Sequence, residues 1–398
     1  MSDKQKAPEG LAPAKPPPWN DPAIRSLVFQ ALALALLGYF FYAVFKNTIS
    51  NMERRGITTG FRFLNEQAGF GILMSLIDYS ETDTYGRTFF VGLFNTLLVS
   101  FLGIIFATIL GFILGVARLS RNWLISKLSA VYIEIFRNIP LLLQIFFWYI
   151  AVLQTLPSAK QSLKIGETFF LNNRGFYFPA PVLEDGFGLV VAAFAAAAAG
   201  IIYMIKWARR RQEKTGRQFP VFWVSLGILI GAPAAAFLVA GMPMSWDYPA
   251  LKRFSFEGGG RIIPELMALL WALTMYTAAF IAEVVRSGIL SVSHGQTEAA
   301  RALGLRGGPT LRLIIIPQAL RVIIPPLTSQ YLNLTKNSSL ATAIGYPDLV
   351  SVFMGTTLNQ TGQAVEVVAM TMGVYLTISL VISTGMNLYN KKTALKER

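Results

Sequence analysis

The sequence predicts an all-α, polytopic membrane protein with about eight transmembrane helices. Of its 398 residues, 54% are hydrophobic and only 14% are charged, and the mean hydropathy is +0.50. Soluble domains have about 25% charged residues, so a chain of this length with so few charges could not cover its own surface in water. Apolar runs of about 20 residues, long enough for a helix to cross a hydrocarbon core about 30 Å thick, recur along the chain.

The composition also excludes several kinds of site. The chain has no cysteine, which excludes disulfide bonds, Cys-ligated metal sites and thiol catalysis. Its single histidine, His294, leaves too few imidazoles for a multi-histidine metal site or proton relay. We therefore predict no metal site and no cofactor on this chain. A net charge of +14 would favour a nucleic-acid partner for a soluble protein, but in a membrane protein the basic residues first report orientation.

The spans follow in order along the chain. Residues 1–25 are polar and Pro-rich, and we expect them to form a tail. The first apolar run is not followed by a cleavage site of small residues, so it predicts a retained span rather than a signal peptide. The candidate spans are 27–45, 89–117, 129–155, 187–205, 219–241, 265–289, 319–356 and 367–389.

The seventh candidate span, 319–356, is too long for one straight crossing. Pro325, Pro326, Lys336 and Pro347 interrupt it. We expect a broken or re-entrant element with one net crossing.

The distribution of basic residues predicts the orientation. Placing 1–25 in the cytoplasm puts about two-thirds of the 35 Lys and Arg residues on the cytoplasmic side. Both termini, 1–25 and 391–398, are then cytoplasmic tails, and no nucleic-acid partner is needed to explain the charge. The densest cluster, Lys-Trp-Ala-Arg-Arg-Arg at 206–211, is interpreted as a topology anchor. Recognition of a specific lipid is the alternative.

The cytoplasmic stretch 295–317 predicts a short helix able to enter a groove on another protein. Glu298 near a helix start would favour the positive end of the helix dipole, and Gly304 permits a sharp helix stop. A second helical stretch, 309–316, then leads into the membrane at Pro317. An ordinary amphipathic loop helix is the alternative that these residues alone leave open. Three alanines give the first helix a slim surface: Ala299, Ala300 and Ala302.

These residues resemble the EAA loop of bacterial ABC importer permeases. The matching residues are Glu298-Ala299-Ala300, then Gly304, then Ile316-Pro317. In that family the loop carries the coupling helix that docks on the ATPase subunit. The resemblance implies coupling to an ATPase through Glu298, Ala299, Ala300, Arg301, Gly304 and Pro317.

Four further segments resemble the polar amino acid branch of that family, which includes histidine, glutamine and general L-amino acid permeases. The resemblance implies a type I ABC importer permease core. The four segments are GLFNTL (92–97), EIFRNIPL (134–141), AEVVRSG (282–288) and LTKNSSL (334–340).

The resemblance also suggests how the chain is organised. It covers 88–156 and 264–390, which would be the two parts of the permease core, with the coupling loop at 295–317. Typical members have five spans. Here 26–87 would add an N-terminal span and a periplasmic loop, and 157–263 would insert periplasmic loops and a pair of spans. This larger layout resembles permeases of the general L-amino acid importers.

The resemblance implies a set of partners in the bacterial inner membrane. These are an ATPase subunit in two copies, a second permease that is homologous or identical, a periplasmic substrate-binding protein, the amino acid substrate and the lipid membrane. The dipeptide Gly-Lys occurs nowhere in the chain, so the phosphate-binding motif GxxxxGK[ST] is missing. We therefore expect ATP and Mg²⁺ to bind a partner chain, and the chain itself to be a transport subunit and not an enzyme.

Ionisable and polar residues within the spans are candidates for a substrate pathway. Glu283 could contact the ammonium of an amino acid, or it could pair with Arg286 three residues later. Lys336, Asn337, Ser338 and Ser339 could line a polar path where the helix breaks, or they could hold a structural bend. Four uncharged residues could contact substrate or make interhelical hydrogen bonds instead: Asn95, Thr96, Asn138 and Gln144.

Three classes of function remain for a multi-span membrane protein of this composition. An ATP-driven importer subunit accounts for the EAA-like loop, the missing phosphate loop and the sparse intramembrane charge. An ion-coupled secondary transporter would usually show inverted repeats or an acidic relay in its spans, and neither is found in the sequence. A membrane enzyme would need a nucleophile, a metal cluster or an acid–base pair, for which one histidine and no cysteine leave little material.

Overall fold

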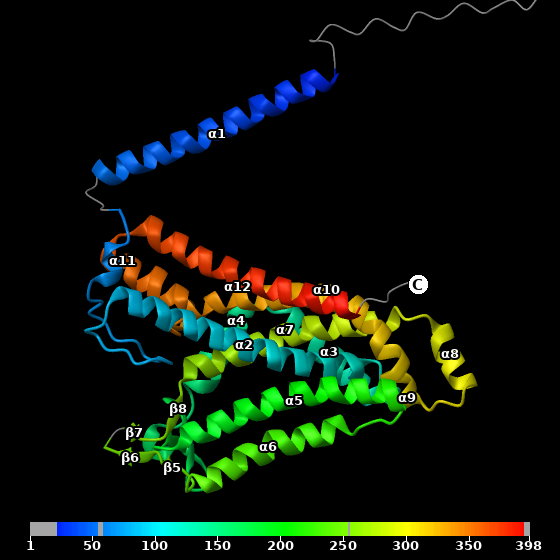
Figure 1. Ribbon diagram of the computed structural model, residues 1–398. Coiled ribbons are helices and arrows are strands. Elements are labelled where there is room, and N and C mark those ends of the chain that lie inside the picture. Colours follow the sequence, from blue (N-terminus) through cyan, green and yellow to red (C-terminus); the bar gives the residue numbers. More distant parts are fainter. Residues whose placement is uncertain (1–21, 55–58, 254, 394–398) are drawn as a thin grey trace, which may run out of the picture.

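The computed structural model describes residues 22–54, 59–253 and 255–393. Long helices run roughly parallel through the molecule (Figure 1), and we name its two ends by what lies there. The α8 end carries α8 (His294–Ala302), α9 (Gly307–Thr310) and the last described residues of the chain. The strand end carries the β-strands and the segment that follows α1 (Pro22–Arg54).

Four long helices form the core: α2 (Tyr85–Arg118), α7 (Pro264–Leu290), α10 (Ile316–Asn337) and α12 (Ala364–Thr393). The closest pair is α2 and α7, because small residues let the two backbones approach. A Cβ added to Gly111 would lie 2.6 Å from the Ile281 side chain. Gly111 and Gly115 of α2 therefore allow the close packing of α2 on α7.

Three buried apolar clusters hold this core together. One joins α2 and α7 to the bent segment after α3, another joins α2, α7 and α10, and a third lies at the strand end. The third includes Phe63 and Ala68, so part of the periplasmic loop expected within 26–87 is folded onto the core there. The amide of Gly60 donates a hydrogen bond of 2.6 Å to Glu366 on α12.

The predicted span at 129–155 is not one straight helix. Helix α3 (Trp123–Asn138) is followed at Pro140 by α4 (Leu141–Phe146) and the π-helical η2 (Phe147–Leu153), and the two halves are bent by 105°. Proline has no amide hydrogen and disfavours a helical conformation in the residue before it, so the chain turns at this point.

The seventh predicted span is interrupted next to Lys336 and at Pro347, as expected, but not at Pro325 and Pro326. Helix α10 runs without interruption through Pro325 and Pro326, so the interruption predicted at those prolines is wrong. The α-helix stops at Asn337, where the 3₁₀ helix η5 (Ser338–Ile344) begins. A second helical piece follows Pro347, formed by η6 (Val350–Thr357) and α11 (Leu358–Thr361).

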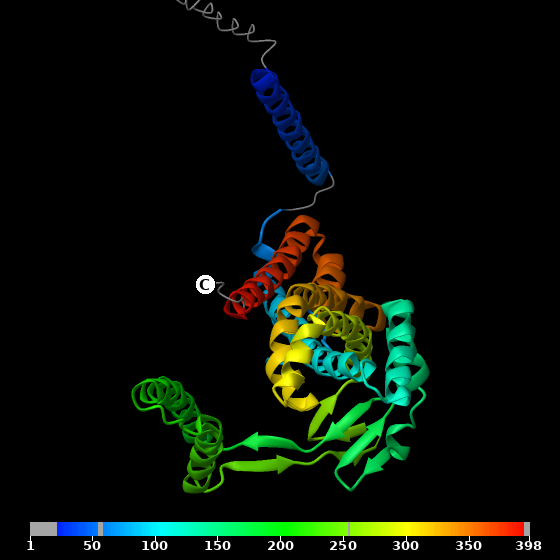
Figure 2. The same cartoon turned by 90° about the vertical axis from the view of Figure 1, so that its right-hand side faces the viewer.

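Two helices form a hairpin beside the core. Helices α5 (Phe187–Thr215) and α6 (Val221–Val239) pack on each other, and Figure 2 shows them standing apart from the core helices. A two-stranded arm of β4 and β5 connects them to the rest of the molecule. Helix α1 also stands apart, on the opposite side of the core.

Eight short strands lie at the strand end, in the segments expected to be loops. They form a four-stranded antiparallel sheet in the order β1-β2-β3-β8 and two two-stranded ribbons, β4-β5 and β6-β7. Strands before and after the hairpin pair with each other, so 157–186 and 242–263 are one unit. The strands are β1 (Leu163–Ile165), β2 (Phe169–Asn172), β3 (Gly175–Phe178), β4 (Ala180–Leu183), β5 (Met244–Asp247), β6 (Ala250–Lys252), β7 (Ser255–Glu257) and β8 (Gly260–Ile262).

The helices confirm the predicted class of an all-α, multi-span membrane protein. Among the described residues, seven helices are long and apolar enough to cross a membrane, and the bent pair at α3 and η2 brings the number to eight if it is counted as a span. The first of them covers Ile24–Asn51, which contains the predicted span 27–45.

Candidate functional site

The segment 293–305 forms a short, exposed helix with a defined end. Helix α8 stops at Ala302, and Gly304 takes a left-handed conformation with φ +77°. The amide of Leu305 donates to the Ala300 carbonyl at 3.0 Å, and the amide of Gly304 donates to the Arg301 carbonyl at 2.9 Å. This pair of hydrogen bonds is the Schellman motif, which favours glycine at the left-handed position. The predicted helix stop at Gly304 has this physical basis.

Helix α8 buries one residue and exposes the rest of the predicted coupling set. Ala300 is 1% exposed, whereas Glu298, Ala299 and Arg301 are exposed. Leu303, just after the helix, is 80% exposed although it is a large apolar residue. The end of α8 therefore presents one large apolar side chain beside the exposed residues of the predicted coupling set.

One detail predicted for α8 is wrong. Glu298 does not lie in the first turn, because the helix begins at His294 and no acidic residue occupies its first turn. The Glu298 carboxylate instead lies 3.0 Å from Nδ1 of His294, one turn earlier. Both side chains are exposed, so this contact contributes little stability.

Helix α8 is attached to α10. The Gln318 amide on α10 donates a hydrogen bond of 3.2 Å to the Gln296 side chain on α8. The short helices α9 and η4 (Leu311–Ile315) connect the two, and Pro317 lies in the first turn of α10, where a proline is tolerated. A movement of α8 would therefore act on α10 directly.

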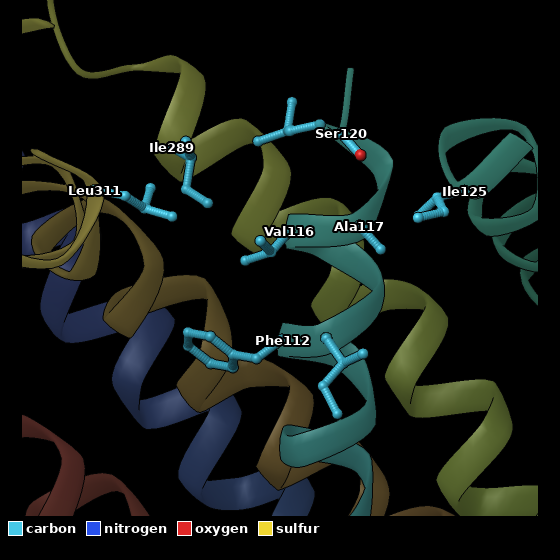
Figure 3. Close-up of a pocket in the computed structure, with 9 residues that line it drawn as sticks. Phe112, Val116, Ala117, Ser120, Ile125, Ile289 and Leu311 are labelled. Carbon is cyan, nitrogen blue, oxygen red and sulfur yellow. The ribbon is translucent and has the colours of Figure 1, made fainter. Parts of the chain in front are cut away.

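An apolar hollow of about 790 Å³ lies beside this connection (Figure 3). Phe112 and Val116 of α2, Ile289 of α7 and Leu311 of η4 point toward one another across it. Ser120 is the one lining residue with a polar side chain. The hollow offers space into which the linker between α8 and α10 could shift, and it offers few groups to hold a polar substrate.

Glu283 lies at the junction of α2 and α7. One carboxylate oxygen accepts a hydrogen bond from Arg286 Nη2 at 2.5 Å, and the other accepts one from Arg118 Nη1 at 2.7 Å. Arg118 also lies 3.9 Å from Glu134 on α3. Glu283 is thus paired with Arg286, as its spacing suggests, and with Arg118, which the sequence analysis missed.

Two of the candidate polar residues hold the strand end of the core. The Asn95 amide donates hydrogen bonds of 2.9 Å to the carbonyls of Met74 and Pro347, and the Thr96 hydroxyl accepts one of 3.0 Å from the Leu349 amide. Both side chains are fully buried. They fix the break after α10 against α2, which is the interhelical alternative left open by the sequence.

The other two uncharged candidates lie on either side of the bend, Asn138 at the end of α3 and Gln144 on α4. Gln144 is 4% exposed and donates to the Phe136 and Ile139 carbonyls at 3.0 and 2.9 Å, so it satisfies carbonyls freed by the bend. Asn138 is exposed and donates to the Glu134 carbonyl within its own helix.

The segment 336–339 borders a small groove of about 360 Å³ that is shared with η6 and α12. Lys336 and Ser339 line it, together with Thr371 and Tyr375 of α12. Ser338 is buried and donates to the Thr335 carbonyl at 2.8 Å. Asn337 lies between them as the last residue of α10.

Asp348 is a buried acid that the sequence analysis missed. Its side chain is fully buried, and its carboxylate accepts hydrogen bonds from the Ser351 amide at 2.8 Å and from the Tyr375 hydroxyl at 3.5 Å. An acidic residue after a proline in a mostly apolar stretch was the available signal. It links η6 to α12 next to the groove.

A metal site is not apparent among the residues that the structure describes. Among residues 22–54, 59–253 and 255–393, no group of three or more His, Asp or Glu side chains is arranged to hold a metal ion. The acidic groups of the core instead contact arginines, amides or hydroxyls.

Residues 107–394 match the family described as "binding-protein-dependent transport system inner membrane component". The match covers the last part of α2, the bent pair, the hairpin, α7, α8, α10 and α12. The chain belongs to this family. It is therefore a permease component of a binding-protein-dependent transport system, situated in an inner membrane, and not an enzyme.

Named relatives of this permease cover nearly the whole chain. It is 55% identical to the putative amino-acid ABC transporter permease protein YhdX of Escherichia coli, over 95% of this chain and 96% of that one. It is 50% identical to the general L-amino acid transport system permease protein AapQ of Rhizobium johnstonii, over 95% and 94%. It is also similar to a crystal structure of an amino acid ABC transporter with histidines, at 19% identity and a TM-score of 0.46, over 77% of this chain and 95% of that one.

Proposed function

We propose that this permease is the transmembrane subunit of an ATP-driven importer of amino acids. The observation that carries the proposal is α8, an exposed, Schellman-terminated helix attached to α10 of a binding-protein-dependent permease. The names of the relatives with near-complete coverage supply the substrate class. The comparisons do not support an ion-coupled transporter.

The proposal includes the rest of the assembly. Two ATPase subunits would bind ATP and Mg²⁺ and receive α8, a second permease that is identical or homologous would complete the pathway, and a periplasmic binding protein would deliver substrate. Both termini would be cytoplasmic. In support, the first described residues of α1, the end of α12 and α8 all lie at the same end of the molecule (Figure 1).

Transport would proceed by alternating access. When the ATPase subunits close on ATP, they would pull α8, and the Gln296–Gln318 contact would pass that movement to α10. Glu283 would link α2 and α7, so that the two helices move together. The pathway would then open toward the binding protein.

Glu283 and Lys336 are the two candidate contacts with substrate, and the structure supports them unequally. The Glu283 carboxylate has a guanidinium on each oxygen, which favours a structural ion pair over contact with an ammonium. The Lys336 and Ser339 side chains line a groove and could receive the substrate carboxylate. We propose the groove at Lys336 as the place on this chain that substrate touches.

The binding protein would dock at the strand end. The strands and turns there expose apolar and aromatic side chains outside the long helices, including Phe169, Trp246 and Tyr248. Phe169, Phe176 and Phe178 stack along one face, with ring centroids 6.1 and 5.8 Å apart. Such a face is suited to a protein contact.

Reconstitution tests the proposed function. The complete complex is placed in proteoliposomes with ATP inside and binding protein with labelled amino acid outside. Uptake should require ATP hydrolysis and binding protein, and it should be unaffected by ionophores that collapse proton and sodium gradients. Uptake that persists without ATP and stops with an ionophore would contradict the proposal.

A further inference from the structure

One end of the α5–α6 hairpin is strongly basic, and orienting the chain in the membrane does not account for the whole of this cluster. Six basic residues are exposed over the last turns of α5 and the turn that follows it, with a single acidic residue, Glu213, among them. None of the six forms an ion pair with the residues that the structure describes. The basic residues are Lys206, Arg209, Arg210, Arg211, Lys214 and Arg217.

The body of the hairpin faces an apolar environment. The most apolar windows of α5 and α6 have mean hydropathies of 2.3 and 2.1, yet only 6% and 0% of those residues are buried within the chain. The two helices pack on each other, and neither has a substantial contact with a core helix. Surfaces this apolar are stable in the hydrocarbon of a bilayer, so the basic end lies where the helices leave it.

Aromatic residues lie beside the basic end, where the two helices leave the hydrocarbon. Trp207 lies next to the basic residues, and Phe222 and Trp223 at the start of α6 are 68% and 70% exposed. The Trp207 ring contacts Phe219 edge to face, with centroids 5.4 Å apart, and the Arg211 guanidinium lies 5.3 Å from it. Exposed tryptophans are typical of the boundary between lipid tails and headgroups.

The arrangement of the basic side chains suits phosphate groups. Ala208 is the buried residue of this stretch, whereas the basic residues around it are exposed. Lys206, Arg210 and Lys214 follow one another at a spacing of four, one above the next on the helix. Guanidinium groups bind phosphate oxygens in pairs, and six cations beside one acid make the surface strongly complementary to anions.

We propose that the basic end of the hairpin binds the phosphate headgroups of anionic phospholipids in the cytoplasmic leaflet. The site holds the hairpin in the membrane beside a core that it barely contacts. It rests on the proposed cytoplasmic position of the α8 end, but not on transport activity or on the identity of the substrate. An acidic surface of a partner protein is the competing occupant.

The test measures lipid contact in the assembled complex. The chain contains no cysteine, so Gln212→Cys places one thiol among the basic residues for a fluorescent label. In nanodiscs, the label should be quenched by headgroup spin-labelled phosphatidylglycerol much more than by phosphatidylcholine carrying the same spin label. Arg209→Gln with Arg210→Gln should weaken the preference by about fivefold per charge removed.

Matched variants and salt complete the design. Arg121→Gln with Lys127→Gln removes two other exposed basic residues at the α8 end and should keep the wild-type preference. An equal loss in this control, or no loss at Arg209 and Arg210, overturns the proposal. So does a label that lipid quenches only after the ATPase is removed, because a protein then covers the site. If the double variant fails to insert, the wild-type preference must still fall with added salt, and a salt-independent preference overturns the proposal.

Discussion

At the scale of single residues, Glu283 illustrates what a sequence can and cannot specify. Its pairing with Arg286 follows from a spacing of three on one helix. Its pairing with Arg118, 165 residues away along the chain, depends on how closely α2 packs on α7. That contact also decides the role of Glu283, because both carboxylate oxygens are occupied.

Replacing Glu283 with Gln tests the role of this pair. The change removes the negative charge shared by Arg118 and Arg286 and should lower the free energy of unfolding by about 1–3 kcal/mol. The thermal midpoint of the purified complex measures the loss. If Glu283 instead contacted substrate, stability would stay unchanged and uptake alone would fall. Arg118→Gln is the matched variant and should destabilise in the same direction.

The other polar candidates show the same limit of sequence reasoning. Asn95, Thr96 and Gln144 were candidates either for contact with substrate or for interhelical hydrogen bonds, and each makes hydrogen bonds to the backbone. Their partners are backbone carbonyls and amides freed at Pro140 and Pro347, where the helices break. A sequence reveals the prolines but not which side chain will reach the freed groups.

At the scale of elements, local chemistry predicted more than length did. The stop of α8 at Gly304 followed from the glycine, and the α8 segment formed as expected. The break next to Lys336 is where it was expected, but Pro325 and Pro326 do not interrupt α10, whose ends are held by tertiary contacts. The strands were missed because each has only three or four residues, too few to show an alternation of apolar and polar residues.

Substitution of Gly304 tests the coupling role of α8. Val at φ +77° is strained, so Gly304→Val should distort the end of α8 and reduce uptake while ATP hydrolysis continues. Asn tolerates this conformation, and Gly304→Asn should retain most of the uptake. A Cβ at this position meets no other atom within 4 Å, so steric overlap does not confuse the comparison. Wild-type uptake in the Val variant would count against the coupling role.

The contact between α2 and α7 gives a second prediction at this scale. Gly111→Ala would force a Cβ to within 2.6 Å of Ile281 and 3.0 Å of the Ala278 carbonyl oxygen. Overpacking of this kind costs about 1–3 kcal/mol, and it should appear as a lower thermal midpoint. Gly227→Ala on the exposed α6 is the control, since no atom lies within 4 Å. Equal thermal midpoints for the two variants would show that α7 leaves room for a methyl group at position 111 of α2.

At the scale of the whole molecule, the hairpin is an addition to a core that folds around α2, α7, α10 and α12. The sequence analysis expected an inserted region at 157–263 and treated 157–186 and 242–263 as separate loops, whereas the structure pairs their strands. The register of β4 and β5 joins them, with Leu183 opposite Met244. Such pairing between distant strands depends on the fold as a whole.

Excision of the hairpin follows from that register. Joining Leu183 to Met244 through Asn-Gly would close β4 and β5 as an ordinary β-hairpin and remove α5 and α6. The buried clusters of the core contain no residue of the excised part, so the thermal midpoint of the core should be unchanged. Loss of assembly with the ATPase or the second permease would mean that the hairpin is a subunit interface.

Cross-linking from α8 tests the central claim most directly. A photoactivatable cross-linker on Ala299→Cys, in a chain with no other cysteine, samples the exposed face of α8 in the complete complex. Ala250→Cys, exposed at the strand end, is the control. The Ala299 position should cross-link to the ATPase subunit with an efficiency that changes when ATP is added, and the Ala250 position should not. A transport-active complex whose ATPase is never captured from Ala299 would contradict the account.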